Sequence, residues 1–118
     1  MPRIMVIDDE AAIRAMIEKI LTSTGHKVVL AADGIDGVNK LRASPADLIV
    51  TDLFMPNQEG LDLIIQLRKE FPKVPIIAMS GKPAGGTLLD IAQRLGAVTI
   101  LQKPFSAEQF LDAVGKAC

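Results

Sequence analysis

The chain has 118 residues, enough for one hydrophobic core and too few for two, so we expect a single domain over residues 1–118. Its 49% hydrophobic and 23% charged residues are typical of a globular protein and argue against disorder. Thirteen Lys and Arg against fourteen Asp and Glu give a formal net charge of -1, which disfavours direct nucleic-acid binding through a basic surface. A single cysteine excludes an internal disulfide, and no apolar run reaches the ~18 residues of a membrane span, so we expect a cytoplasmic protein without membrane contact.

Five short apolar runs, each rich in Val and Ile, are distributed along the chain. In chain order they are Ile4–Ile7, Lys27–Ala31, Asp47–Thr51, Pro75–Met79 and Val98–Leu101. Most are nearly continuous rather than alternating. This pattern is typical of strands buried on both faces, as in a parallel sheet covered by helices.

Stretches with helical spacing of apolar residues separate or follow these runs. In chain order the stripes cover residues 13–21, 35–41, 61–65, 88–95 and 107–114. Gly25 and Gly96 follow two stripes as C-cap candidates, and Ser106 precedes the last stripe as an N-cap candidate. Because strand and helix alternate five times, the sequence predicts an α/β fold, an open doubly wound parallel sheet of five strands with helices on both faces.

Chemically reactive side chains follow four of the five predicted strands. The segments are Asp8-Asp9-Glu10, Thr51-Asp52, Ser80-Gly81 and Gln102-Lys103-Pro104. Each segment alone is compatible with an ordinary helix cap, turn or solvated loop. In a parallel sheet, however, these strand ends meet at one edge, where ligands bind in the crevice beyond the carboxyl ends. The sequence therefore predicts a functional site at this edge.

The charges expected at this edge favour a bound cation. Asp8, Asp9 and Asp52 are mainly ionised at neutral pH, and two such charges ~5 Å apart repel by roughly 3 kcal/mol at an effective dielectric constant of ~20. Lys103 offsets part of this repulsion, and Mg²⁺ is the best additional cation, because it takes only one or two carboxylates and retains waters and a phosphate oxygen. An aspartate beside Mg²⁺ can attack a phosphoryl group and form an acyl phosphate, whose oxygen the Ser80 hydroxyl can bind.

These segments resemble the receiver domain of two-component response regulators, the CheY-like family, over the whole chain. The matching segments are Val6–Glu10, Asp47–Pro56 with Gly60, Ser80-Gly81 and Lys103-Pro104-Phe105. The resemblance implies a flavodoxin-like sheet of strand order 2-1-3-4-5. It also implies that residues 1–118 form one receiver domain, a phosphorelay module of signal transduction.

For catalysis, the resemblance implies three residues. Asp52 is expected to accept a phosphoryl group from a histidine of a sensor histidine kinase or a histidine phosphotransfer protein. Ser80 is expected to receive a phosphoryl oxygen, and Lys103, directed by a cis bond to Pro104, to pair with Asp52 and then with the phosphate. No separate turnover substrate is expected, so the chain is not an enzyme in the usual sense.

For the cofactor, Mg²⁺, the resemblance implies four positions. Asp9, Asp52 and the backbone carbonyl of Phe54 are expected to bind the ion directly, and Asp8 through water. Phosphorylation is then expected to change the surface made by helix four, strand five and helix five, where an output domain or effector protein binds. The sequence is also compatible with a homodimer.

Three positions depart from the family's usual pattern. Ile100 occupies a position that is often Tyr or Phe, and an aliphatic side chain cannot make the inward aromatic rotation that accompanies switching. Phe54 and Lys82 lie two residues after Asp52 and Ser80, at positions that influence the access of water to the acyl phosphate. We expect Phe54 to shield the phosphate and the loop Gly81–Gly86 to be a mobile connection that phosphorylation rearranges.

Three other functions are compatible with the same sheet. A flavin-binding module needs aromatic partners for its ring, whereas the sequence has no Trp or Tyr and an acidic edge. An aspartate-nucleophile phosphatase similar to the haloacid dehalogenase family carries a DxD motif after the first strand, whereas here Asp8 and Asp9 are adjacent. A receiver that only docks or dimerises, without phosphorylation, has no need for the charge repulsion of the full acidic set.

Overall fold

The main sheet has five parallel strands in the order β2–β1–β3–β6–β7. In the computed structural model the described residues are 3–55, 58–80, 94, 99–103 and 105–117. The strands are β1 (Arg3–Ile7), β2 (Lys27–Ala31), β3 (Leu48–Asp52), β6 (Ile76–Ser80) and β7 (Thr99–Gln102). This confirms the predicted doubly wound fold and its strand order 2-1-3-4-5. The direction of winding reverses between β1 and β3, which are neighbours in the sheet.

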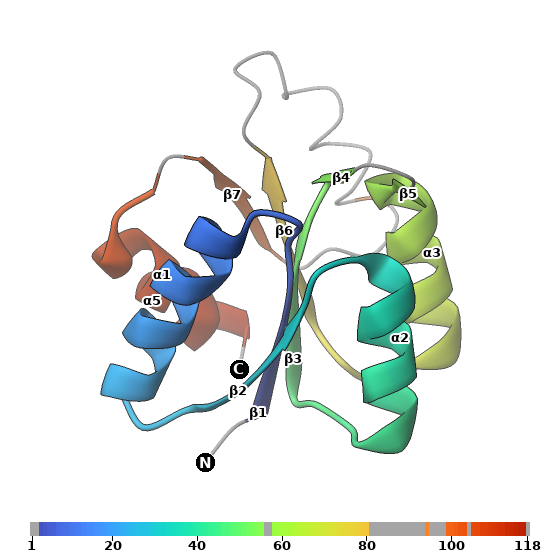
Figure 1. Ribbon diagram of the computed structural model, residues 1–118, viewed down its shortest axis with the longest axis horizontal. Coiled ribbons are helices and arrows are strands. Elements are labelled where there is room, and N and C mark those ends of the chain that lie inside the picture. Colours follow the sequence, from blue (N-terminus) through green and yellow to red (C-terminus); the bar gives the residue numbers. More distant parts are fainter. Residues whose placement is uncertain (1–2, 56–57, 81–93, 95–98, 104, 118) are drawn as a thin grey trace.

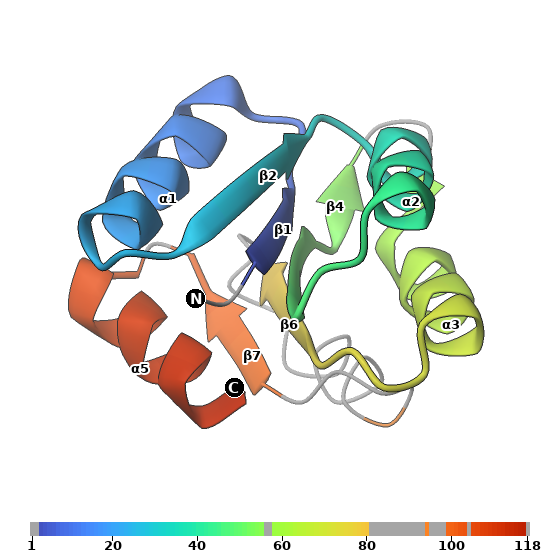
Figure 2. The same cartoon turned by 90° about the horizontal axis from the view of Figure 1, so that it is seen from below.

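Two pairs of helices cover the two faces of the sheet, as Figures 1 and 2 show. One face carries α1 (Ala11–Ser23) and α5 (Ala107–Ala117), and the other carries α2 (Gly34–Ala43) and α3 (Gly60–Glu70). Successive side chains of a strand point to opposite faces, so β3 contributes Ile49 to one apolar cluster and Leu48 and Val50 to the other. Each face of the sheet therefore packs against its own apolar core, which explains why the strand sequences are apolar at successive positions. Among the described residues, no helix combines the length and apolarity needed to cross a bilayer.

β2 has its predicted boundaries and β1 begins one residue earlier than predicted, whereas β3, β6 and β7 each begin and end one residue later. β3 and β6 each extend one residue further than predicted, so that Asp52 and Ser80 are their last residues. Both residues retain partners in the sheet register, Asp52 with Met79 and Ser80 with Gln102. Their backbones are therefore fixed by the sheet itself rather than by a following loop.

A small antiparallel hairpin, which the sequence did not predict, follows β3. It consists of β4 (Phe54–Met55) and β5 (Gln58–Glu59), and Phe54 pairs with Glu59. Strands of two residues are too short to show a hydrophobic period, so no pattern could have indicated them. The predicted helical stripe over residues 88–95, apart from the helical Arg94, lies outside the described residues, as do Gly96 and the loop Gly81–Gly86.

Two of the predicted helix caps are confirmed. Gly25 follows α1 with a φ of 85°, a conformation in which a glycine lacks the steric penalty of a side chain. At the start of α5, the Gln109 N–H donates to Ser106 Oγ at 3.0 Å, and the Ser106 N–H donates to Gln109 Oε1 at 2.8 Å. This reciprocal pair is a capping box and fixes where α5 begins.

Gly37 allows α2 to approach β1 closely. A Cβ atom here would lie 2.6 Å from Cδ1 and 2.9 Å from Cγ1 of Ile7, which is fully buried. We therefore expect Gly37→Ala to lower the free energy of unfolding by about 1–2 kcal/mol, because overpacking outweighs the better helix propensity of alanine. Urea denaturation measures the change.

Gly115→Ala is the control, because its new Cβ meets nothing within 4 Å, and we expect it to raise the free energy of unfolding by about 0.5–1 kcal/mol. Equal gains in both variants would contradict the close approach.

Candidate functional site

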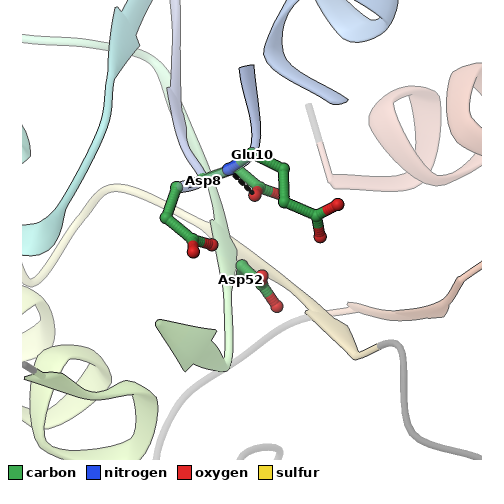
Figure 3. Close-up of side chains that lie close together, drawn as sticks. Asp8, Glu10 and Asp52 are labelled. Carbon is green, nitrogen blue, oxygen red and sulfur yellow. Dashed lines mark hydrogen bonds between the residues drawn. The ribbon is translucent and has the colours of Figure 1, made fainter. Parts of the chain in front are cut away.

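Four carboxylates gather at the carboxyl ends of β1 and β3. One carboxylate oxygen from each of Asp8, Asp9, Glu10 and Asp52 lies within 4.8 Å of the others. Figure 3 shows Asp8 and Glu10, which follow β1, next to Asp52 at the end of β3. The two strands are neighbours in the sheet, so the convergence follows directly from the strand order. We refer to these four residues as the acidic cluster.

Three hydrogen bonds fix the segment that follows β1. The Asp8 N–H donates to the Ala31 carbonyl at 3.1 Å, which continues the pairing of β1 with β2 by one residue. The Glu10 N–H donates to Asp8 Oδ1 at 2.9 Å, and Arg14 Nη1 on α1 donates to the Asp8 carbonyl at 2.7 Å. Asp8 is fully buried as a result, whereas Asp9 and Glu10 are exposed.

Asp52 is held by the centre of the sheet. It is the last residue of β3 and is buried. The next residue, Leu53, donates its N–H to the Met79 carbonyl of β6 at 2.9 Å and is itself part of the apolar core. The backbone on both sides of Asp52 is therefore anchored. Its carboxylate has little freedom to move away from the acidic cluster.

Lys103 places one cation among these carboxylates. Its N–H donates to the Ser80 carbonyl at 2.7 Å, which anchors its backbone just after β7. Its Nζ lies 2.8 Å from Asp8 Oδ2, 3.3 Å from Asp52 Oδ2 and 3.6 Å from Glu10 Oε1. Burial by itself lowers the pKa of Lys103, but the hydrogen bond to Asp8 and the charges of Asp52 and Asp8 outweigh it. The pKa is raised above 10.5, so Lys103 is a permanent cation at neutral pH.

Ser80 lies at the same edge of the sheet. It is the last residue of β6, which pairs with β3 on one side and β7 on the other, and it is fully buried. Its carbonyl accepts the Lys103 N–H, so the position of the lysine depends on the end of β6. β6, which ends with Ser80, therefore lies between β3, which ends with Asp52, and β7, which directly precedes Lys103.

The structure brings together most of the residues that the sequence singled out. Asp8, Asp9, Asp52 and Lys103 form one group, and Ser80 lies on the adjoining strand end. The Phe54 backbone belongs to β4, immediately beyond Asp52, but its side chain lies outside the described residues. Lys82 and Pro104, and with Pro104 the predicted cis bond, also lie outside them.

Two residues at the site received no role from the sequence. Glu10 belongs to the acidic triplet after β1 and lies close to Lys103, which is 93 residues further along the chain. No local sequence pattern reveals a contact over such a distance. Arg14 is one helical turn beyond Glu10 and supports the Asp8 carbonyl. Arg14 lies in the first turn of α1 and is therefore close in sequence to the end of β1. Only the structure shows which group its side chain contacts.

The donor set fits a hard divalent cation. The acidic cluster offers carboxylate oxygens, which Mg²⁺ prefers, and the Phe54 carbonyl is a further oxygen two residues after Asp52 in the chain. A mixture of buried and exposed carboxylates leaves one side of the site open to solvent, so that an ion can keep several of its waters. Among the described residues, Lys103 supplies one positive charge against the four carboxylates of the acidic cluster, and this excess of acidic groups favours a bound cation.

Comparisons with known proteins agree with this geometry. The sequence matches the family model of the response regulator receiver domain over residues 4–115. It is 31% identical over 114 residues to the DNA-binding transcriptional regulator NtrC of Rhizobium meliloti, covering 97% of this chain and 23% of that protein. Thus the chain spans only 23–24% of the length of the NtrC relatives that it matches.

Solved structures share the fold over nearly the full chain. The receiver domain of NtrX from Brucella abortus is 28% identical with a TM-score of 0.92, covering 97% of this chain and 96% of that one. The chemotaxis protein CheY4 of Vibrio cholerae is 26% identical with a TM-score of 0.93, covering 100% of this chain and 99% of that one.

Proposed function

Because this chain belongs to the family of response regulator receiver domains, we propose that residues 1–118 form one receiver domain that accepts a phosphoryl group on Asp52. The observation that carries this proposal is the position of Asp52, a buried carboxylate whose Oδ2 lies 3.3 Å from Lys103 Nζ and which shares one acidic cluster with Asp8 and Asp9. A nucleophile, a cation for the phosphoryl oxygens and ligands for a divalent ion are thus present at one point.

The proposed step is a transfer from a phosphohistidine to Asp52. A carboxylate oxygen of Asp52 forms a bond to phosphorus while the phosphorus–nitrogen bond breaks, and the leaving imidazole nitrogen keeps the electron pair. Lys103 Nζ exchanges its contact with Asp52 for one with a phosphoryl oxygen and offsets the charge that arrives. The Ser80 hydroxyl binds a second phosphoryl oxygen.

Mg²⁺ is the cofactor that we propose for this site. Asp9, Asp52 and the Phe54 carbonyl would hold it directly and Asp8 through water, and when bound it would neutralise the phosphoryl oxygens. The contacts of Asp8 support the water-mediated role, since its Oδ1 accepts the Glu10 N–H and its Oδ2 already binds Lys103. Asp9, by contrast, is exposed at the open side of the site.

The partners follow from the same chemistry. The phosphoryl donor is a sensor histidine kinase or a histidine phosphotransfer protein in the cytoplasm, and the receptor of the signal is an output domain or an effector protein. The relatives support this reading, since NtrC is described as a DNA-binding transcriptional regulator and this chain corresponds to only 23% of its length. The output surface would include β7 and α5, which lie next to each other at one side of the fold (Figure 2). The chain transfers its phosphoryl group to water and has no other turnover substrate.

Incubation with acetyl phosphate and Mg²⁺, followed by intact-mass measurement, tests the proposed function. We expect wild-type protein to gain one phosphoryl group and Asp52→Asn to gain none, because an amide is not a comparable nucleophile. Removal of Mg²⁺ with EDTA is expected to abolish the gain in the wild type. Asp112→Asn, which removes an exposed carboxylate from α5, is the control and should react like the wild type. Equal phosphorylation of Asp52→Asn would refute Asp52 as the acceptor.

A further inference from the structure

Glu10 differs from the other partners of Lys103 in its exposure to solvent. The side chains of Asp8 and Asp52 are 0% and 4% exposed and that of Lys103 is 12% exposed, whereas Glu10 is 61% exposed. Together with Asp9, which is also exposed, Glu10 forms the solvent side of the acidic cluster.

The contact between Glu10 and Lys103 is electrostatic rather than a hydrogen bond. The 3.6 Å between Glu10 Oε1 and Lys103 Nζ exceeds the usual range of an N–H to O hydrogen bond, whereas the 2.8 Å to Asp8 lies within it. The position of the Glu10 backbone is nevertheless fixed, because its N–H donates to Asp8 Oδ1. The Glu10 carboxylate therefore adds a negative charge on the solvent side of the acidic cluster, and Lys103 offsets it only through a longer ion pair.

The negative charge of Glu10 has opposite effects on the divalent cation and on the phosphodonor that must both reach the site. It attracts a divalent cation, and it repels a phosphodonor in proportion to the negative charge of the donor. The effect is strong at low ionic strength and weak at high ionic strength, because Glu10 is largely solvated. A close partner such as Asp8, which is fully buried, is screened much less.

We propose that Glu10 is a specificity-determining residue that makes the site discriminate between phosphodonors by their charge. This inference rests on the proposed function of Asp52 as phosphoacceptor. Glu10 disfavours small dianionic acyl phosphates such as acetyl phosphate relative to small donors of lower net negative charge such as phosphoramidate. The residue thereby limits phosphorylation by free metabolites while it favours binding of the metal ion.

Comparison of Glu10→Gln with the wild type tests the proposal. The substitution is compatible with folding, because Glu10 is exposed and its side chain makes no capping hydrogen bond at the start of α1. At low ionic strength we expect the rate constant with acetyl phosphate to rise about fivefold and that with phosphoramidate to rise about twofold or less. Both differences should disappear in ~1 M salt, where the Debye length is ~3 Å. Glu10→Asp, which keeps the charge, should retain the wild-type preference between the donors.

Two further measurements separate the proposal from other effects. Isothermal titration calorimetry with Mg²⁺ alone, which requires no phosphorylation, should show a several-fold weaker affinity in Glu10→Gln. Glu18→Gln removes the same charge from an exposed position on α1, eight residues further along the helix, and should leave both rates and the Mg²⁺ affinity unchanged.

The outcomes are distinguishable. Equal acceleration with both donors, no acceleration at low ionic strength, or a difference that persists in ~1 M salt would each overturn the role of Glu10, provided that the wild type is phosphorylated. A wild-type protein that takes up no phosphoryl group from either donor would instead overturn the proposed function, and this inference with it.

Discussion

Lys103→Met is expected to lower the free energy of unfolding by about 3 kcal/mol, which corresponds to a loss of roughly 10 °C in melting temperature for a domain of this size. The reason is that Lys103 Nζ is the cation 2.8 Å from Asp8 and 3.3 Å from Asp52, and both carboxylates are buried. Methionine has a similar length but no charge, so it leaves the two carboxylates beside each other without their ammonium. Chemical denaturation at neutral pH and low salt measures the difference.

A matched control comes from an exposed ion pair. Lys116 lies 3.3 Å from Asp112 one turn away on α5, and both side chains are well exposed. Lys116→Met should therefore change the free energy of unfolding by less than about 0.5 kcal/mol. A loss as large as that of Lys103→Met would show that any lysine of this protein contributes similarly, and the argument from burial would fail.

The pH dependence gives an independent check on the same pair. The pKa of Lys103 is raised in the folded protein, so the ammonium contributes stability that is fully present below its ordinary pKa of 10.5. This contribution is lost as the pH rises through the higher pKa of the folded state. The stability difference between wild type and Lys103→Met should thus be constant from neutral pH to about 10.5 and should shrink above it.

Mg²⁺ is expected to stabilise the wild-type protein, and Asp9→Asn is expected to remove most of that stabilisation. A ligand that binds only the folded state adds about 2.7 kcal/mol at a concentration of 100 times its Kd. Asp9 is exposed and lies within the acidic cluster, so an isosteric amide removes a metal ligand without disturbing the core. Without Mg²⁺ the variant should be at least as stable as the wild type, because one like charge has left the cluster.

Thermal unfolding across a Mg²⁺ titration distinguishes these expectations. Asp112→Asn, on the exposed face of α5, removes a carboxylate outside the acidic cluster and should keep the full wild-type response. The same increase in melting temperature for Asp9→Asn and wild type would place the ion elsewhere on the protein. In that case the acidic cluster would be balanced by Lys103 alone.

The fold class could be predicted from the sequence because an alternation of buried strands and amphipathic helices is compatible with only a few topologies. Strands buried on both faces and helices between them require right-handed crossovers in a parallel sheet, whereas the strand order 2-1-3-4-5 came from the family resemblance and matches the observed one. The same reasoning located the site, since strand ends such as Asp8 and Asp52 come to one edge in any sheet of this kind. The hairpin β4–β5 was missed, because two-residue strands have no periodicity to detect.

The sequence by itself thus determined the α/β class, the edge of the sheet that carries the chemistry, and the acidic and basic side chains present there. Only the tertiary structure decided how the acidic triplet after β1 divides its tasks. Asp8, Asp9 and Glu10 are consecutive and chemically similar, yet Asp8 is buried against Lys103, 95 residues away, while the other two face solvent. That division depends on the hydrogen bonds of Asp8 with Ala31 and Arg14 and on the end of β6 that anchors Lys103. These are long-range contacts, and charge, hydropathy and spacing along the chain do not encode them.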